Sequence, residues 1–483
     1  MVATANEPST TSAPGRRGFG TLFVVDLWER FSFYGMAAIL VLYLAAPVAD
    51  GGQGMSGQTA TALFACYISL AFMAGLPGGW LADRVLGARR SVLLGGGLIV
   101  AGHVTLSLPF DASVYLGLFL VATGTGLVKP AMAAMVGGTG GSDDRDREAV
   151  FSLFYMSIQV SAVIAPVVTG FLAEKVAWHL GFAAAAAGMA LGLVQFTLGL
   201  RKFGDLGRYP AHPLPPAEIQ RVLRRTAAVA VPVAVVLVAG VASGTVPLQA
   251  VLALFGLGTL VVPFWFLNTL RRRGALEMPR ARLRSFTLLM LAASTFWMIF
   301  AQSGSVLGLF AERDTDRAVG GYEVPASWFQ SVHPLFVLLI APLCAWLWVR
   351  AGDRLTVPVK FAAGLTAGGL SFVLMAVAAV DAQSGPVTPM WLLVVYLLFS
   401  CAEVAIAPVG LALAASVAPP GYGSRFLAVN GLFGAVGVVI GGQLYRLTTG
   451  IPLPAYFVLA GGIALLAAVL VAAYRHRLLA GLS

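Results

Sequence analysis

Residues 26–35 have the sequence DLWERFSFYG and place Asp26, Glu29 and Arg30 inside a segment that is otherwise apolar enough to span a membrane. A charged side chain near the bilayer centre costs at least about 2.5–3.5 kcal/mol, so such residues normally face a water-filled path and mark transport or proton relay. Helical spacing puts both acids and the arginine on one face, with Tyr34 one turn further along. The stretch therefore predicts a membrane helix with a functional polar face.

The composition of the whole chain is also that of a membrane protein. Of 483 residues, 58% are hydrophobic and only 11% are charged, and the mean hydropathy is +0.86. A helix needs about 20 apolar residues to cross about 30 Å of hydrocarbon. We therefore predict an all-α membrane protein with fourteen spanning segments, at about residues 20–46, 57–82, 90–109, 113–136, 149–173, 177–200, 222–243, 248–270, 283–311, 325–350, 357–380, 388–416, 423–447 and 453–476.

The net charge of +10 does not indicate a nucleic-acid partner, because the Lys and Arg residues fall mainly in alternate loops. This is the positive-inside pattern of membrane proteins. It predicts a multi-pass protein of the cell (inner) membrane with both termini in the cytoplasm. The first 18 residues lack the apolar core and cleavage site of a secretory signal, so we expect residues 1–18 to form a disordered cytoplasmic tail.

The sequence gives no support to an enzymatic function. It contains no Gly-rich nucleotide loop and no spaced set of Cys and His residues for a metal. Cys66, Cys344 and Cys401 all lie in apolar segments, which favours free thiols over a disulfide framework or a zinc site. We therefore expect no enzyme activity, cofactor or metal, and an ion gradient as the source of energy.

A polar, basic stretch divides the chain into two halves. We expect an N-terminal six-helix bundle at 19–200, a linker with an inserted helix hairpin at 201–282 and a C-terminal six-helix bundle at 283–483. The sequence ADRVLG at 82–87 is echoed by GDRL at 352–355, between the corresponding helices. Six-helix halves related by such repeats are typical of secondary transporters, although two solvated basic turns are the alternative explanation.

Further motifs follow the helix 1 stretch in order along the chain. They are GGWLADRVLG at 78–87, GTGLVKP at 124–130, FYMSI at 154–158, FWMIFAQSGS at 296–305, WFQSVHP at 328–334, and Glu403 with PVGL at 408–411. Together with residues 26–35, this set resembles the motifs of the proton-dependent oligopeptide transporters, a branch of the major facilitator superfamily. The likeness extends from helix 1 to helix 10, and the inserted helix pair is similar to that of bacterial members.

The resemblance implies the major facilitator fold, with two six-helix bundles, an inserted two-helix hairpin and alternating access to a central site. The expected function is proton-coupled import of di- and tripeptides or peptide-like compounds by a monomer in the lipid bilayer. Several departures from the family pattern leave a second function open, in which the chain is an exporter or facilitator of a peptide-like metabolite or drug.

By resemblance, Arg30, Tyr34 and Lys129 face the carboxylate of the peptide, because a guanidinium offers the bidentate geometry that a carboxylate prefers. Asp26 and Glu29, together with Arg30 and Lys129, are the expected proton-coupling groups. A substrate carboxylate on the cations weakens their hold on the two acids, so that a proton binds more easily. For Lys129 the alternative is an ion pair with Asp26 or Glu29, and the two roles are compatible.

The resemblance also implies that Glu403 binds the ammonium group of the peptide, with a structural pair to a cation as the alternative. Ala301 stands where many members carry an acid, and His333 stands where the family has an asparagine. His333 either takes over the titrating role of the missing acid or stays neutral and hydrogen-bonds the substrate or a neighbouring helix. The other expected substrate-binding residues are Phe33 and Phe72, which replace tyrosines, Gln159, which replaces an asparagine, and Trp297 and Gln302.

The charged turn between helices 2 and 3 resembles the loop clamp of the superfamily, which holds the two halves together in the outward-facing state. We predict Asp83 and Arg84 as gating residues, with Asp353 and Arg354 at the corresponding junction of the second half. Exposed pairs of this kind contribute little, so this role requires partial burial.

Overall fold

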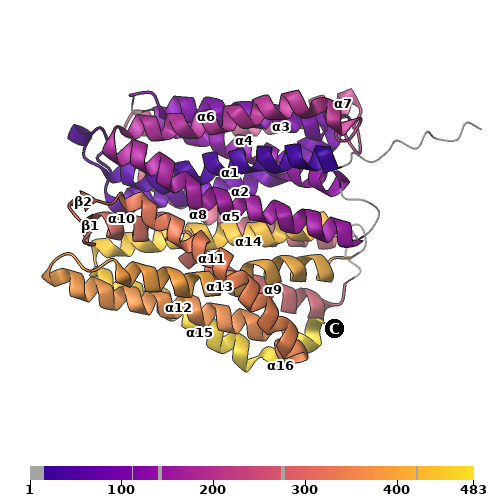
Figure 1. The fold of residues 1–483 in the computed structure, drawn as a ribbon. Coiled ribbons are helices and arrows are strands. Elements are labelled where there is room, and N and C mark those ends of the chain that lie inside the picture. The colour runs from indigo at the N-terminus through magenta and orange to yellow at the C-terminus, as the bar shows by residue number, and fades with distance from the viewer. Residues whose placement is uncertain (1–15, 111, 140–143, 273–277, 420–421, 483) are drawn as a thin grey trace, which may run out of the picture.

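The computed structural model describes residues 16–110, 112–139, 144–272, 278–419 and 422–482, and most of them form helices (Figure 1). Residues 1–15 of the expected tail lie outside the described residues, and the first helix begins at Arg16, slightly earlier than expected. The first half contains α1 (Arg16–Ala45), η1 (Val48–Asp50), α2 (Gly57–Leu81), η2 (Ala82–Leu86), α3 (Ala88–Leu106), α4 (Ser113–Thr139), α5 (Asp144–Lys175), α6 (Trp178–Gly199) and η3 (Leu200–Phe203).

Two helices follow before the second half begins, namely α7 (Pro216–Ala242) and α8 (Leu248–Arg272). The second half contains α9 (Arg280–Phe300), α10 (Val306–Arg313), β1 (Ala318–Val319), β2 (Tyr322–Glu323), η4 (Ala326–Ser331), α11 (Val332–Ala351), η5 (Gly352–Arg354), α12 (Val357–Asp381), η6 (Ala382–Ser384), α13 (Met390–Val417), α14 (Gly423–Leu444), η7 (Tyr445–Thr449), α15 (Leu453–Ala473) and α16 (Arg475–Leu482).

In the part of the chain that the structure describes, thirteen helices are long and apolar enough to cross a membrane. They correspond to thirteen of the fourteen predicted segments. The remaining segment, predicted at 90–109, forms α3, a helix of 19 residues that carries Arg89 and Arg90 in its first turn. Because these charges make it less apolar, a membrane crossing by α3 stays a prediction.

Two predicted helices are interrupted in the structure, which corrects their boundaries. The segment predicted at 283–311 forms α9 and α10, separated by turns at 301–305. Ser303 and Ser305 there donate hydrogen bonds to carbonyls of the preceding turn, and such bonds compete with a continuous helix. The segment predicted at 325–350 begins with the 3-10 turn η4 before α11 starts.

A short β-hairpin between α10 and η4 was not predicted. Val319 pairs with Tyr322, which leaves Gly320 and Gly321 as a two-residue loop. Both glycines have positive φ, at 58° and 84°. Such a loop favours glycine because other residues rarely adopt this conformation.

The two halves form two layers, with the first half above the second in Figure 1. In the first half α1 packs on α5 and α6, and α3 packs on α4, while in the second half α12 packs on α13 and α15. The halves meet mainly where α2 packs against α14 and where α5 packs against η4 and α11. Of the inserted pair, α8 lies against α14, whereas α7 buries none of its residues.

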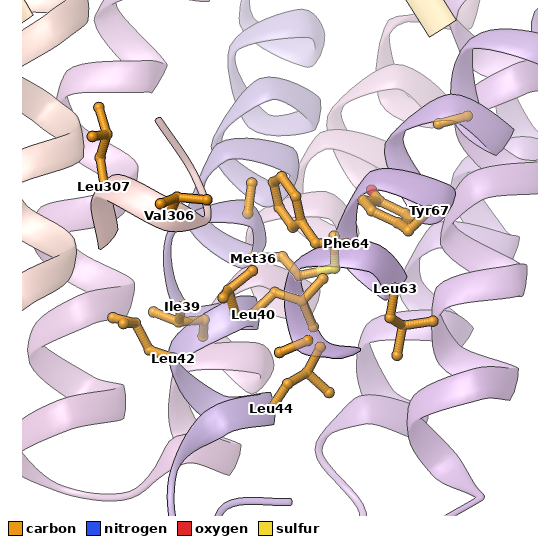
Figure 2. Close-up of a cluster of buried hydrophobic side chains, with 14 of the residues drawn as sticks. Met36, Ile39, Leu40, Leu42, Leu44, Leu63, Phe64, Tyr67, Val306 and Leu307 are labelled. Carbon is orange, nitrogen blue, oxygen red and sulfur yellow. The ribbon is translucent and has the colours of Figure 1, made fainter. Parts of the chain in front are cut away.

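The halves are closed at the end of the bundle that carries β1 and β2, which we call the hairpin end. Here the apolar residues of α1 and α2 pack against α10, as Figure 2 shows for Met36, Ile39, Leu40, Leu63, Phe64, Val306 and Leu307. Trp328 donates to the carbonyl of Val167 at 3.0 Å, and Ser331 donates to that of Val163 at 2.7 Å. At the opposite, terminal end, where the chain ends, the described part of α4 makes no extensive contact with the second half.

Gly170 lies at a close approach between α5 and η4. A Cβ at this position would collide with the side chain of Ser327, whose own Cβ would lie 2.9 Å away. We expect Gly170→Ala to lower the Tm, because overpacking typically costs about 1–3 kcal/mol. The matched control is Gly97→Ala on α3, where an added Cβ meets nothing within 4 Å. Equal Tm values for the two variants, measured in detergent, would contradict this close packing.

Candidate functional site

The polar face of α1 is buried and internally paired. The Nε of Arg30 lies 3.5 Å from Oδ1 of Asp26 and 3.3 Å from Oε2 of Glu29. The two acids are only 1% and 2% exposed, and the Ser157 hydroxyl of α5 donates to Oδ2 of Asp26 at 2.6 Å. One guanidinium therefore contacts two buried carboxylates, as the spacing on α1 predicted.

Lys129 of α4 lies close to this cluster but contacts aromatic rings. Its Nζ is 4.5 Å from the ring centre of Phe33 and 5.6 Å from that of Phe72. The side chains of Asp26 and Glu29 are both described, and neither lies within 4 Å of the ammonium group, although both interact with it electrostatically. The alternative ion pair is therefore absent from this conformation. The two phenylalanines give Lys129 cation–π contacts instead.

A chain of aromatic side chains connects the two halves at this level. The ring of Phe72 on α2 lies 6.0 Å from that of Trp297 on α9, in an edge-to-face arrangement. Trp297 lies 5.0 Å from Phe300, and Phe300 lies 5.8 Å from His333 on α11. The structure thus brings Phe33, Phe72, Trp297 and His333 into one row, which begins at Lys129.

His333 and Glu403 form a second polar pair at the other end of this row. The Nε2 of His333 lies 2.8 Å from Oε2 of Glu403 on α13, and both side chains are largely buried. The ring of Phe399 covers the imidazole at 5.1 Å, and Ser400 donates to the backbone carbonyl of His333 at 3.0 Å. Glu403 therefore has a partner in its own half, His333, which forms the expected pair with a cation only when it is protonated.

Tyr34 lies between the two polar groups. It interacts electrostatically with Arg30 and Glu29 on its own helix and with Glu403 of the second half. The site therefore has a cationic pole at Arg30 and Lys129 and an acidic pole at Glu403, supplied by opposite halves. This arrangement suits a small dipolar molecule with an anionic end and a cationic end.

Two expected site residues are buried in this conformation, and the first of them, Gln302, makes contacts within the second half. The amide of Gln302 donates to the carbonyl of Met298 at 3.1 Å, and its carbonyl accepts the Tyr456 hydroxyl of α15. Gln302 is 1% exposed and so belongs to the packing of the second half. Gln159 is also buried, on the part of α5 that faces α1, at 5% exposure.

The expected gating residues contact the linker after α6. The backbone carbonyls of Asp83 and Arg84 accept hydrogen bonds from His212 and Leu214. Arg84 also donates to the His212 carbonyl at 3.5 Å. The side chain of Asp353 lies outside the described residues, and Arg354 is exposed in η5.

Neighbouring Arg89 holds the same linker. Its Nε donates to the carbonyl of Leu206 at 2.7 Å, its Nη2 contacts the carbonyl of Gly204, and its backbone amide donates to the carbonyl of Gly207. Burial lowers the pKa of Arg89, and the neighbouring Arg208 lowers it further. The turn between α2 and α3 is therefore tied to the linker in this conformation.

Sequence reasoning missed two polar residues near the α1 cluster. Ser157 donates to Asp26, as described above, and His103 of α3 lies 2.6 Å from the Ser32 hydroxyl. His103 is fully buried. An ionisable residue in an apolar segment is itself a signal for a polar contact, and it identifies His103 but not Ser157.

A charged cluster closes the hairpin end. Glu174 of α5 accepts hydrogen bonds from the backbone amides of Ala326 and Ser327, at 2.7 and 2.9 Å, and from the Ser327 hydroxyl at 2.5 Å. Arg317 lies 2.7 Å from Glu323 and 3.9 Å from Glu174. Burial raises the pKa of Glu312 in the same cluster, although Arg313 and Arg317 counteract it. Among the described residues, no group of three or more His, Cys, Asp or Glu side chains is arranged to hold a metal.

The chain is similar to known transporters over nearly its full length. An uncharacterized transporter of Bacillus subtilis, YclF, is 35% identical and covers 96% of this chain and 97% of its own. A di-/tripeptide transporter of Lactococcus lactis subsp. cremoris is 34% identical, over 89% of this chain and 88% of its own.

Solved structures agree with these relatives. A crystal structure of a peptide transporter POT in complex with sulfate superimposes with a TM-score of 0.91 at 37% identity, covering 96% of this chain and 95% of that one. A POT family transporter in complex with a thioalcohol conjugated peptide gives 0.89 at 30% identity, covering 96% of both chains. A family profile described as POT family matches residues 89–459. The chain therefore belongs to the POT family, whose members are membrane transporters of peptides and not enzymes.

Proposed function

We propose that this protein imports di- and tripeptides, or peptide-like compounds, together with protons across the cell (inner) membrane. The observation that carries the proposal is the pair of opposite poles, with Arg30 and Lys129 in one half and Glu403 in the other. A zwitterionic peptide has a carboxylate for the first pole and an ammonium group for the second. Recognition by the charged ends leaves side chains of different size free to vary.

At the carboxylate end of the peptide, the Arg30 guanidinium supplies paired N–H donors, and Lys129 and Tyr34 lie beside it. Both acids contact the Nε edge of the guanidinium. The Nη groups are the atoms that suit bidentate binding of a carboxylate. Phe33, Phe72 and Trp297 then form the apolar wall between the poles, while Gln159 and Gln302 act through the packing of their helices.

Proton coupling is assigned to Asp26 and Glu29. Two carboxylates that share one guanidinium repel each other, and a substrate carboxylate on the same cation weakens its hold on both. A proton on one of the acids then restores the balance of charge. With its charges balanced, the loaded site is able to switch its access from one side of the membrane to the other. A site with an unbalanced buried charge is costly to reorganise in this way.

The charge pattern of the loops supports an assignment of the side of the membrane to which the site is open. If the Lys- and Arg-rich loops face the cytoplasm, both termini are cytoplasmic and the closed hairpin end faces outward. The conformation is then inward-facing. Asp83, Arg84, Asp353 and Arg354 are proposed to meet only when the terminal end closes, which is consistent with the present contacts of Asp83 and Arg84 to the linker and with the exposure of Arg354. We expect the transporter to act as a monomer.

A second function is favoured by Ala301, where many family members carry an acid. Loss of a proton-binding group suits a facilitator or exporter of a peptide-like metabolite or drug, which does not need to accumulate its substrate inside. A facilitator or exporter would use the same two poles as the importer. It would differ from the importer in not using the proton gradient to accumulate its substrate inside.

Uptake of dialanine by proteoliposomes distinguishes the two functions. With an acidic exterior and an inside-negative potential, we expect dialanine to accumulate above its external concentration, and a protonophore to abolish the accumulation. Equilibration without accumulation supports the facilitator. An absence of both uptake and binding would overturn peptide transport by this chain.

A further inference from the structure

His333 and Glu403 are each other's partner, and both side chains are largely buried. The contact joins α11 to α13 at 2.8 Å, and neither Nε2 of His333 nor Oε2 of Glu403 has a hydrogen bond of good geometry to any other group in the described part of the chain. The rings of Phe300 and Phe399, which stack on each other, both lie against the imidazole. A carboxylate in such surroundings needs a cation, because an unpaired buried charge is strongly unfavourable.

The groups that face this pair leave the imidazole as the nearest possible cation. From α13 come Glu403 itself and the Tyr396 ring, which lies 6.5 Å from the imidazole. From α9 comes the uncharged ring of Phe300, and the charged side chains that the structure describes on α5, Glu174 and Lys175, contact the hairpin end instead. From α1, Tyr34 interacts with both Glu403 and Arg30, but Arg30 is already held by its two acids.

We infer that His333 is a built-in, proton-dependent competitor for the ammonium group of the substrate, and so a specificity-determining residue. This inference rests on the proposed function, in which Glu403 receives that ammonium group. When the site is empty, protonated His333 neutralises Glu403. When an amine binds, it takes the place of the imidazolium at the carboxylate, and His333 gives its proton to water.

The sign of the pH dependence follows directly. Competition between one proton and one ammonium group weakens amine binding tenfold for each pH unit below the midpoint of the imidazole titration. Acid therefore opposes binding at this pole, whereas at Asp26 and Glu29 acid favours the loaded state. A substrate amine is selected most strongly near neutral pH.

The test compares His333→Asn with the natural protein. The Kd of dialanine is measured by calorimetry on the purified full-length transporter from pH 5.5 to 7.5. We expect the ratio of the natural Kd to that of the variant to rise as the pH falls over this range, by up to tenfold for each pH unit. The helix 1 acids are present in both proteins, so their contribution cancels in the ratio. The matched control is His476→Asn, at an exposed histidine of α16. For this variant, the ratio of the natural Kd to the variant Kd should not change with pH.

The outcomes separate this inference from the proposed function. If His333→Asn does not fold, His333→Gln supplies a second neutral amide. A flat ratio, in a protein that accumulates dialanine, overturns the role of His333 and leaves peptide import intact. Failure of dialanine binding and uptake in the natural protein overturns the proposed function, and the role of His333 with it.

Discussion

Glu29→Gln is expected to abolish proton-driven accumulation of dialanine while leaving exchange of labelled for unlabelled peptide in place. Glu29 is 2% exposed, and its Oε2 lies 3.3 Å from the Arg30 guanidinium. Glutamine has the same shape but neither carries nor releases a proton at this position. Binding and reorientation of the loaded site therefore continue, but the proton gradient no longer drives them.

The measurement is the ratio of internal to external peptide in proteoliposomes under an imposed pH gradient. We expect the ratio to fall to about one in the variant. Each tenfold accumulation in the natural protein corresponds to about 1.4 kcal/mol drawn from the gradient. Glu218→Gln, at an exposed acid in the first turn of α7, is the matched control. Accumulation in Glu29→Gln equal to that of the control would exclude Glu29 as the coupling group.

Arg30→Lys is expected to reduce dialanine binding by at least tenfold although the positive charge is kept. The guanidinium contacts Asp26 and Glu29 through one edge and has a second edge available for a bidentate carboxylate. An ammonium group has a single nitrogen, which cannot hold both acids and the substrate in these positions. The loss of one charge-assisted hydrogen bond typically costs about 1.5–3 kcal/mol.

Binding is measured as the Kd at neutral pH, alongside the Tm of the variant in detergent. A retained Tm with weakened binding separates a role in recognition from a role in stability. The matched control is Arg446→Lys, because Arg446 contacts Gln443 and Gln249 at the surface, away from both poles. A Kd for Arg30→Lys within twofold of the natural value would refute the bidentate role of Arg30.

The positions of the long helices were predictable because the membrane imposes one simple constraint on length and polarity. Breaks within them were harder to predict. The turns at 301–305 lie in an apolar run that satisfies the length criterion, and they coincide with local Ser bonds and with a close approach of Gly304 to Phe64 of α2. A tertiary contact of this kind leaves no periodic pattern. The Gly320–Gly321 pair, by contrast, is a local signal that predicts a hairpin turn.

The candidate site was predictable in its residue types and less so in its pairings. The spacing on α1 correctly grouped Asp26 and Glu29 with Arg30, because those contacts lie within one helix. The cation–π contacts of Lys129 and the contact of His333 with Glu403 join different helices. Their geometry depends on how the bundles pack, so the sequence left several partners open for each.

The Glu174 carboxylate has a consequence for the timing of transport. It accepts three hydrogen bonds from the start of η4, so that a side chain of one half serves as the helix cap of the other. These bonds share one acceptor and one short segment, and they must therefore break together when the hairpin end opens. Hydrogen bonds to a charged group contribute about 1.5–3 kcal/mol each. If the hairpin end faces outward, as proposed above, its opening is thus expected to have a distinct activation barrier that limits the return of the empty carrier for its next substrate.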